Sequence, residues 1–337
     1  MVWIFGEFSR DKGARPLRLN PFHPVVSELL TKGRELADKL GEELGIVILG
    51  YGIDLTDFCL MVSDFGIDKI YLVDDIRLSD FNVEPYTSVI TKIVLKYKPN
   101  IFIAGATSLS RTLFPRIAAR LRTGLTTDCT ALGVENGLLV QTRPAFGGNI
   151  TATIICPYMK PQMATVRYKA LKSPKSKIQS PKSKIQIIRE SFTKIELNSR
   201  TQVIKFIEDV TQKINLDTAD IIVAGGMGLH SRENFKILEE LALIVGGAVA
   251  SSRPPVDNGW ISYSHQVGQT GKTVRPRVYI ACGISGAMQH LAGMSSSEQI
   301  IVINNNPNAP IFKIADIGIC GDLFEIVPKL IERWKWK

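Results

Sequence analysis

The chain has 337 residues and a formal net charge of +9, with 45% hydrophobic and 22% charged residues. This length suffices for two domains with sizeable cores, and the composition is typical of a globular protein. No apolar run is long enough to cross a bilayer, which argues against direct membrane insertion. Glu7 interrupts the first apolar run where a signal peptide needs an unbroken one, so we expect a cytoplasmic protein. Basic residues are scattered without an aromatic-basic module, which argues against nucleic-acid binding.

The five cysteines are far apart in the sequence and form no C-x-x-C pair. This spacing argues against a zinc site, an iron–sulfur cluster and a disulfide framework, so we expect no metal. Most of the cysteines lie in apolar, strand-like runs, where a buried and unreactive thiol is typical. They are Cys59, Cys129, Cys156, Cys282 and Cys320.

The first half alternates strand-like runs with helical patterns, which predicts βαβ units and a mostly parallel sheet. The predicted strands are 2–7, 45–50, 69–74 and 101–106, and a predicted helix covers 25–44. Four further strand-like runs follow with only short turns between them, so we expect an antiparallel extension of the same sheet. These runs are 129–134, 138–146, 150–156 and 162–168.

Residues 173–186, SPKSKIQSPKSKIQ, repeat a seven-residue unit in direct tandem. A repeat this short, rich in Pro, Ser and Lys, cannot bury a core, so it predicts a solvated basic loop over 172–187. A docking arm for an acidic partner is the functional alternative. We expect an N-terminal α/β scaffold domain over 1–200 and a second domain over 201–337, which opens with a helical pattern at 201–213.

The second half is a further series of strands and helices, which predicts a doubly wound, flavodoxin-like domain. Small-residue turns follow most of its strands, and ligands of such sheets bind at the carboxyl ends of the strands. The predicted strands are 219–226, 246–252, 277–283, 299–305 and 317–322, and helical patterns cover 231–245 and 285–292.

One turn of this half, GQTGKT at 268–273, ends like a phosphate-binding P-loop. A P-loop needs a second glycine five residues before Gly271, and Gln266 stands there. A P-loop also leads from a strand into a helix, whereas Pro276 blocks a helix here and a strand follows. The spacing therefore disfavours a nucleotide hydrolase and leaves a turn with backbone amides and the Thr270 hydroxyl.

Two other turns have features of nucleotide-binding loops. Ser285 follows a strand and is predicted to cap an apolar helix, whose first amides suit a pyrophosphate. A hydrolase nucleophile at Ser285 is disfavoured because Ala287 stands where G-x-S-x-G needs glycine. Gly226 and Gly228 form a G-x-G turn, but no acidic residue completes a dinucleotide fingerprint.

The remaining turns place polar side chains at strand ends. Arg253 precedes two prolines that stiffen the backbone, so it is predicted to face an anionic or electron-rich ligand. Asn304 ends one strand and Asp322 opens another helix, where they suit sugar hydroxyls and an adenine edge. Five such turns in one domain favour a large dinucleotide as the ligand.

In this order, these stretches closely resemble the α subunit of electron transfer flavoproteins. SRPPVDNGW, QVGQTGKTVRPRVYIACGISGAMQHLAGM and NPNAPIFKIADIGICGDLF match the FAD-domain signature of that family nearly throughout. Two N-terminal stretches, 123–132 and 143–167, resemble the version found in anaerobes, which includes the electron-bifurcating type.

The resemblance implies FAD in the C-terminal domain. Arg253 is implied to lie over the isoalloxazine and stabilise its negatively charged reduced forms, and Thr270 to hydrogen-bond the flavin N5. His290 is implied to add positive character near the pyrimidine-ring carbonyl, and the amides around Ser285 to hold pyrophosphate and ribityl oxygens. The full implied set is Ser252, Arg253, Val267, Gly268, Gln269, Thr270, Ser285, Gly286, Ala287, Met288, Gln289, His290, Asn304, Asp322 and Leu323.

The implied function is electron transfer without acid–base or hydrolytic chemistry, in a heterodimer with a β subunit that holds AMP or a second FAD. The implied redox partner is a flavin dehydrogenase or a quinone-linked oxidoreductase, and an NADH-dependent bifurcating complex is a further hypothesis. One departure is Met227, where many relatives carry an Arg that touches the ADP part of FAD. A nucleotide hydrolase built on GQTGKT and a flavin-free structural subunit are the alternatives.

Overall fold

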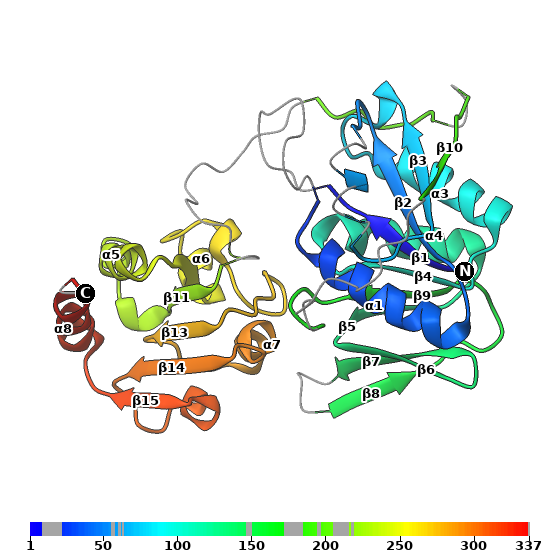
Figure 1. Cartoon of the computed structure of the whole chain (residues 1–337). Helices are drawn as coiled ribbons and strands as arrows, with labels where there is room; N and C mark the ends of the chain where they lie inside the picture. Colours follow the sequence, from blue (N-terminus) through cyan, green and yellow to red (C-terminus); the bar gives the residue numbers. More distant parts are fainter. Residues whose placement is uncertain are drawn as a thin grey trace. The chain divides into compact units, whose positions relative to one another are not determined.

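A computed structural model describes residues 1–8, 22–54, 58–59, 62, 64–145, 150–171, 185–193, 197–204, 216 and 219–335. The described elements fall into two compact units, which Figure 1 labels by element. We call them the N-terminal unit, which carries β1 to β10, and the C-terminal unit, which carries β11 to α8. No helix in these ranges is long and apolar enough to cross a membrane. Nor do these ranges contain a group of three metal-binding side chains.

The N-terminal unit is built on a seven-stranded sheet in the order β10-β3-β2-β1-β4-β9-β5, and its paired strands run parallel. Alternate β1 residues enter two separate cores: Val2 and Ile4 pack with helix α1, whereas Trp3 and Phe5 pack with helices α3 and α4. The bounds are β1 Val2–Gly6, α1 Val25–Leu40, β2 Leu44–Gly50, β3 Lys69–Asp74, α3 Val83–Tyr97, β4 Ile101–Gly105, α4 Ser108–Leu121, β5 Leu125–Cys129, β9 Gln162–Val166 and β10 Gln186–Arg189.

The first predicted helix is too long at its C-terminal end. Helix α1 stops at Leu40 because Gly41 adopts left-handed backbone angles, with φ of 64°, and its amide bonds back to the last turn. Leu44, which the helical pattern includes, instead begins β2.

The antiparallel part is present, but it is a separate sheet instead of an extension of the large one. It consists of β6 (Ala131–Glu135), β7 (Leu138–Ala145) and β8 (Ile150–Ile154). Asn136 and Gly137 join β6 to β7 with φ angles of 50° and 76°, as a two-residue hairpin requires. The run at 162–168 is different, because β9 pairs parallel with β4 and β5 in the large sheet.

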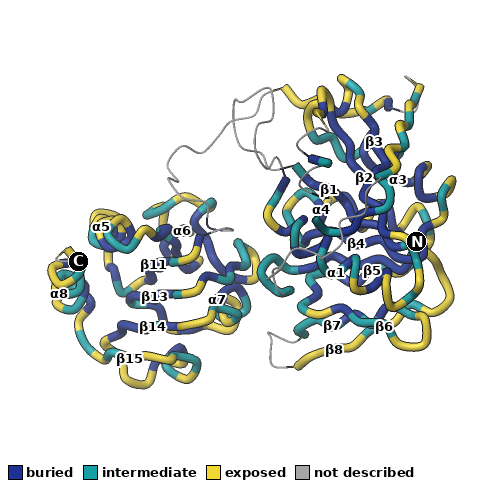
Figure 2. Tube along the Cα trace, in the orientation of Figure 1, coloured by how far each residue is buried: buried dark blue, intermediate teal, exposed yellow. Residues whose placement is uncertain are grey.

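The C-terminal unit has a five-stranded parallel sheet in the order β12-β11-β13-β14-β15. This order confirms the flavodoxin-like prediction. Helices α5 and α8 pack on one face, and α7 packs with loop residues on the other; Figure 2 shows the buried strands between them. The bounds are β11 Ile221–Gly225, α5 Phe235–Val245, β12 Ala248–Ser251, α6 Arg253–Asp257, β13 Val278–Cys282, α7 Met288–Met294, β14 Gln299–Asn304, β15 Ile317–Cys320 and α8 Leu323–Trp334.

Two predictions fall partly outside the described residues. Residues 173–184 of the tandem repeat lie outside the described residues, and of its last two residues, 185 and 186, Gln186 begins β10. Of the helical pattern at 201–213, residues 201–204 are described and are not helical, and the rest lies outside.

Candidate functional site

The candidate site begins where the strand order reverses, at the carboxyl ends of β11 and β13. The loops after these two strands touch directly: the Gly226 amide donates to the Cys282 carbonyl at 2.9 Å, and the Gly228 amide to the Gly283 carbonyl at 3.0 Å. A Cβ on Gly226 would lie 2.2 Å from the Gly283 oxygen. The G-x-G turn therefore requires its glycines for loop-to-loop packing, a reason that differs from the close approach to phosphate expected of such turns.

The loop at 266–272 is closed by its own backbone. The Gly268 amide donates to the Lys272 carbonyl, the Lys272 amide to the Gln266 carbonyl at 2.8 Å, and the Gln269 amide to the Gln289 carbonyl at 2.7 Å. No helix follows, since the chain continues without regular structure to β13. A P-loop needs its amides free to wrap phosphates. These amides are already bonded, so the structure contradicts the hydrolase reading of GQTGKT.

Thr270 is the exposed tip of this loop. Its Oγ1 accepts a hydrogen bond of 3.0 Å from Gln266 Nε2, and its carbonyl accepts one from the Tyr263 hydroxyl. A hydroxyl carries one donor and two acceptor positions, so the Thr270 hydrogen is available to a ligand. Neither Gln266 nor Tyr263 was predicted from the sequence as a supporting residue for Thr270.

The segment after β13 corrects the prediction for Ser285. Helix α7 begins at Met288 with Ala287 before it, so Ser285 does not cap that helix. The reason is Gly286, whose φ is +91° and whose absent Cβ would lie 2.5 Å from the Ile311 amide nitrogen. This backbone contact keeps the chain extended before the helix.

The same segment supplies unpaired donors. No described residue accepts a hydrogen bond from the amides of Ser285, Gly286 or Ala287, and the exposed Ser285 hydroxyl has no described partner. Phosphate oxygens are acceptors only, so these groups match a pyrophosphate. The predicted helix cap at Ser285 is wrong, but hydrogen-bond donors are still available in this segment.

Arg253 is the first residue of α6 and is not held in an irregular loop. Its side chain is 65% exposed and its Nε donates to Asp257 Oδ2 at 3.1 Å. Before it, Ser252 is buried and its amide donates to the Gly225 carbonyl. Arg253 is thus anchored beside the end of β11 with most of its guanidinium open to a ligand.

His290 is buried, with 5% of its surface exposed. Its Nδ1 donates to the Val267 carbonyl at 3.0 Å, which leaves Nε2 to accept from the Tyr279 hydroxyl at 3.1 Å. Burial lowers the pKa of His290 to about 4. The ring is therefore neutral near pH 7 and already bonded at both nitrogens, and its implied effect on the flavin stays a prediction.

Asn304 and Asp322 lie at strand and helix ends as predicted. Asn304 Nδ2 donates to the Ile284 carbonyl at 2.8 Å, so it supports the segment with the free amides. Asp322 is exposed and caps α8 by accepting from the Phe324 amide at 2.8 Å. Buried Leu323 approaches the position that a Gly283 Cβ would occupy, at 3.0 Å.

These contacts bring most of the implied residues into one edge of the C-terminal unit. Two features join the parts: the 266–272 loop bonds to Gln289 and His290, and Asn304 bonds beneath Ser285. The groups that remain open there are Arg253, the Thr270 hydroxyl and the amides at 285–287. Cations, hydroxyls and amides are the donors that a flavin dinucleotide needs, so the residues present fit FAD.

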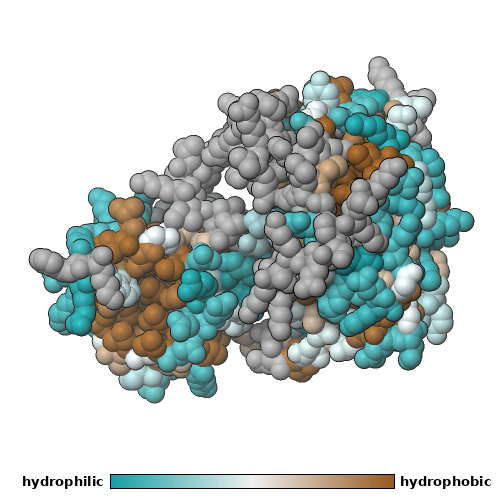
Figure 3. Space-filling view, in the orientation of Figure 1, coloured by the Kyte–Doolittle hydropathy of each residue, from teal (hydrophilic) through white to brown (hydrophobic). Residues whose placement is uncertain are grey.

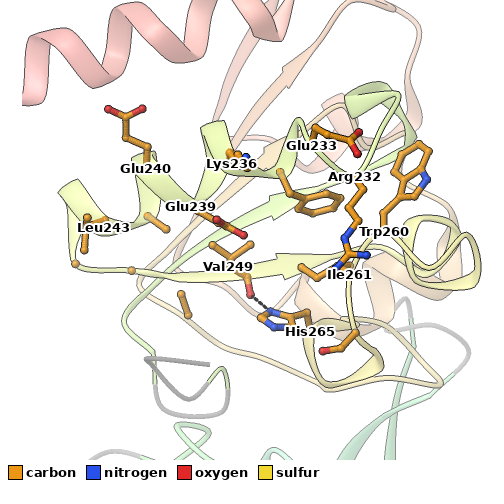
Figure 4. Close-up of a pocket in the computed structure, with 16 residues that line it drawn as sticks. Arg232, Glu233, Lys236, Glu239, Glu240, Leu243, Val249, Trp260, Ile261 and His265 are labelled. Carbon is orange, nitrogen blue, oxygen red and sulfur yellow. Dashed lines mark hydrogen bonds between the residues drawn. The ribbon is translucent and has the colours of Figure 1, made fainter. Parts of the chain in front are cut away.

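A cavity of about 960 Å³ lies elsewhere in this unit, between α5, the edge strand β12 and residues 260–265. Figure 4 shows Arg232, Trp260 and His265 around it, and His265 Nδ1 donates to the Val249 carbonyl at 2.8 Å. None of the implied FAD residues lines this cavity. The candidate FAD site is thus an open edge instead of this cavity.

Two family models match the chain, one over its N-terminal part and one over its C-terminal part. The family described as "Electron transfer flavoprotein domain" matches residues 18–191, and "Electron transfer flavoprotein FAD-binding domain" matches 215–295. The second match includes Arg253, Thr270 and the 285–290 segment, whereas Asn304 and Asp322 lie beyond it.

Full-length relatives extend the match. The electron transfer flavoprotein subunit alpha of Thermoanaerobacterium thermosaccharolyticum is 48% identical over 99% of this chain and 97% of its own length. Protein FixB of Clostridium saccharobutylicum is 45% identical over 99% and 96%, and the alpha subunit of Megasphaera elsdenii is 46% identical over 92% of each chain. The chain therefore belongs to the electron transfer flavoprotein alpha-subunit family, and its C-terminal unit is an FAD-binding domain.

Proposed function

We propose that this chain carries electrons as the α half of a heterodimer with an electron transfer flavoprotein β subunit. The observation that supports this most is the set of donors that remain open to a ligand at one edge of the C-terminal unit: the exposed Arg253 guanidinium, the Thr270 hydroxyl and the amides at 285–287. FAD supplies the redox chemistry when bound, and the protein positions and tunes it.

Each donor has a distinct proposed role. The amides at 285–287 bind the anionic pyrophosphate, and Thr270 donates to the flavin N5. Arg253 places a positive charge beside the ring system, which favours the forms that carry negative charge. His290, which is neutral and bonded to the Val267 carbonyl, holds the 266–272 loop against α7.

Exposed apolar surface on the C-terminal unit supports a partner subunit. Several large apolar side chains of the C-terminal unit are exposed, and Figure 3 shows a mainly apolar area on its visible face. Such surface is typical of interaction sites. The exposed residues are Met227, Leu243, Tyr263, Met288 and Ile317. We propose domains at 1–200 and 201–337, with the first packing on the β subunit and the second binding FAD.

The test is reconstitution with the β subunit, followed by the visible spectrum and a reductive titration. Arg253→Ala should retain FAD and lower its potential, while Arg253→Lys should keep most of the wild-type value because the charge remains. Asp257→Asn serves as the matched control, since it removes only the ion-pair partner of Arg253. A heterodimer without flavin absorbance contradicts the proposed function, and an unchanged titration for Arg253→Ala contradicts the role of that residue.

We propose flavin dehydrogenases as electron donors and a quinone-linked oxidoreductase as acceptor. The resemblance of 123–132 and 143–167 to anaerobe sequences supports the narrower hypothesis of an NADH-dependent bifurcating complex. Counting flavins per heterodimer separates the two cases: two FAD support bifurcation, and one FAD with AMP opposes it.

A further inference from the structure

Gln266 lies directly behind the exposed Thr270 hydroxyl. Gln266 is buried, with 3% of its surface exposed, whereas Thr270 is exposed at the tip of the loop. Gln266 Nε2 donates to Thr270 Oγ1 at 3.0 Å. The contact therefore joins a buried amide to the one hydroxyl of the loop that faces solvent.

The backbone holds both residues in place. The Gln266 amide donates to the Tyr263 carbonyl, and the Gln266 carbonyl accepts from the Lys272 amide at 2.8 Å. At the other end of the contact, the Tyr263 hydroxyl donates to the Thr270 carbonyl. These bonds fix the backbone positions from which the two side chains meet.

The direction of this hydrogen bond decides what Thr270 can offer a ligand. An amide nitrogen has hydrogens but no acceptor lone pair, so the Thr270 hydrogen cannot point back toward Gln266 Nε2. The hydroxyl therefore keeps its hydrogen for an acceptor outside the loop. An acceptor-only group in place of Gln266 would attract that hydrogen inward and leave only oxygen lone pairs outside.

We propose that Gln266 is a positioning residue that fixes the Thr270 hydroxyl as a hydrogen-bond donor to FAD. This inference rests on the proposed function, because it concerns the flavin nitrogen that Thr270 is proposed to face. Gln266 acts through Thr270 and does not itself touch the ligand.

The test compares Gln266→Glu with Gln266→Met in the heterodimer from which FAD has been removed and then titrated back. The ionised Glu accepts from Thr270 and reverses the bond, so the FAD dissociation constant should rise about tenfold at pH 8. Burial raises the pKa of a carboxyl. As the pH falls and this Glu protonates, its O–H can donate to Thr270 and affinity should recover, whereas Gln266→Met should show a pH-independent loss.

A double-mutant cycle with Thr270→Ala shows whether the two residues act together. If Gln266 acts through Thr270, Gln266→Met should have little further effect on FAD affinity in the Thr270→Ala background. Hydrogen exchange of 266–272 in the flavin-free heterodimer serves as the folding control and should match the wild type in Gln266→Met.

The outcomes separate this inference from the proposed function. A wild-type heterodimer that takes up no FAD contradicts the function. A wild-type heterodimer that binds FAD overturns only the positioning role if Gln266→Glu binds as tightly at pH 8, or if Gln266→Met and Thr270→Ala have additive effects.

Discussion

The two units share a parallel α/β architecture but have different residues at the carboxyl ends of their strands. After β1, the buried Glu7 carboxylate accepts from the Thr107 hydroxyl and, at 3.2 Å, from the Ser110 hydroxyl. After β3, Asp74 accepts from the Gly52 amide at 2.7 Å. In the C-terminal unit, glycines follow β11 and β13, the exposed Arg253 follows β12, and the exposed Asp322 after β15 caps α8. The same sheet type can thus be closed by internal acidic acceptors or left open for an anionic ligand.

The largest expected effect is a loss of stability from a substitution in the open edge of the C-terminal unit. Gly226→Ala should destabilise the C-terminal unit by about 3 kcal/mol, because the new Cβ would lie 2.2 Å from a backbone oxygen. The Gly226 φ of −114° suits any residue, so the clash is the whole cause. Hydrogen exchange resolved by unit measures this. Gly259→Ala is the control: its φ of +69° has open space around it and should cost about 1 kcal/mol. Equal losses would argue against the loop contact.

The second prediction concerns the stability of the C-terminal unit at low pH. His290 in the folded chain has a pKa of about 4, below its ordinary value of 6.5, because it is buried. Between these pH values the unfolded state binds more protons, so the free energy of unfolding should fall as the pH falls through this window, by about 3 kcal/mol in total. Urea unfolding of the C-terminal unit at several pH values tests this. His290→Gln should remove this share of the pH dependence; an unchanged slope would contradict the assignment.

The third prediction concerns the closed edge. Thr107→Val should destabilise the N-terminal unit by about 2 kcal/mol, because Thr107 both caps α4 through the Ser110 amide and donates to Glu7. FAD affinity should stay at the wild-type value. Thr107→Ser keeps both bonds and serves as the control. Weaker FAD binding in Thr107→Val would show that the two edges do not act separately.

The smallest expected effect comes from Asp322, where two substitutions distinguish capping of helix α8 from contact with FAD. Asp322→Ala should cost about 1 kcal/mol of stability, because the Phe324 amide loses its acceptor. Asp322→Asn keeps an oxygen for that amide, so its stability should be close to the wild type. Urea unfolding measures the stability and FAD titration measures the ligand contact. Weaker FAD binding in Asp322→Asn with normal stability would assign the carboxylate to the ligand.

The sequence predicts the architecture well where the signal is local. Strand–turn–helix alternation predicts the C-terminal sheet. Gln266 stands where a P-loop needs a glycine, which correctly argues against a P-loop. Contacts between distant segments are not predictable in this way. The contact of Gly286 with Ile311 moves the helix start from Ser285 to Met288, and the packing of distant segments buries His290, which lowers its pKa and leaves the ring neutral.

The 266–272 loop and helix α7 meet through backbone atoms. A Cβ on Gly293 would lie 2.4 Å from the Gly268 nitrogen, and one on Gly268 would lie 2.9 Å from the Gln289 oxygen. Peptide dipoles packed this closely have no rotamers to exchange, so they cannot turn when the charge on a neighbouring flavin changes. Such fixed dipoles would rearrange little beside a bound flavin whose charge changes.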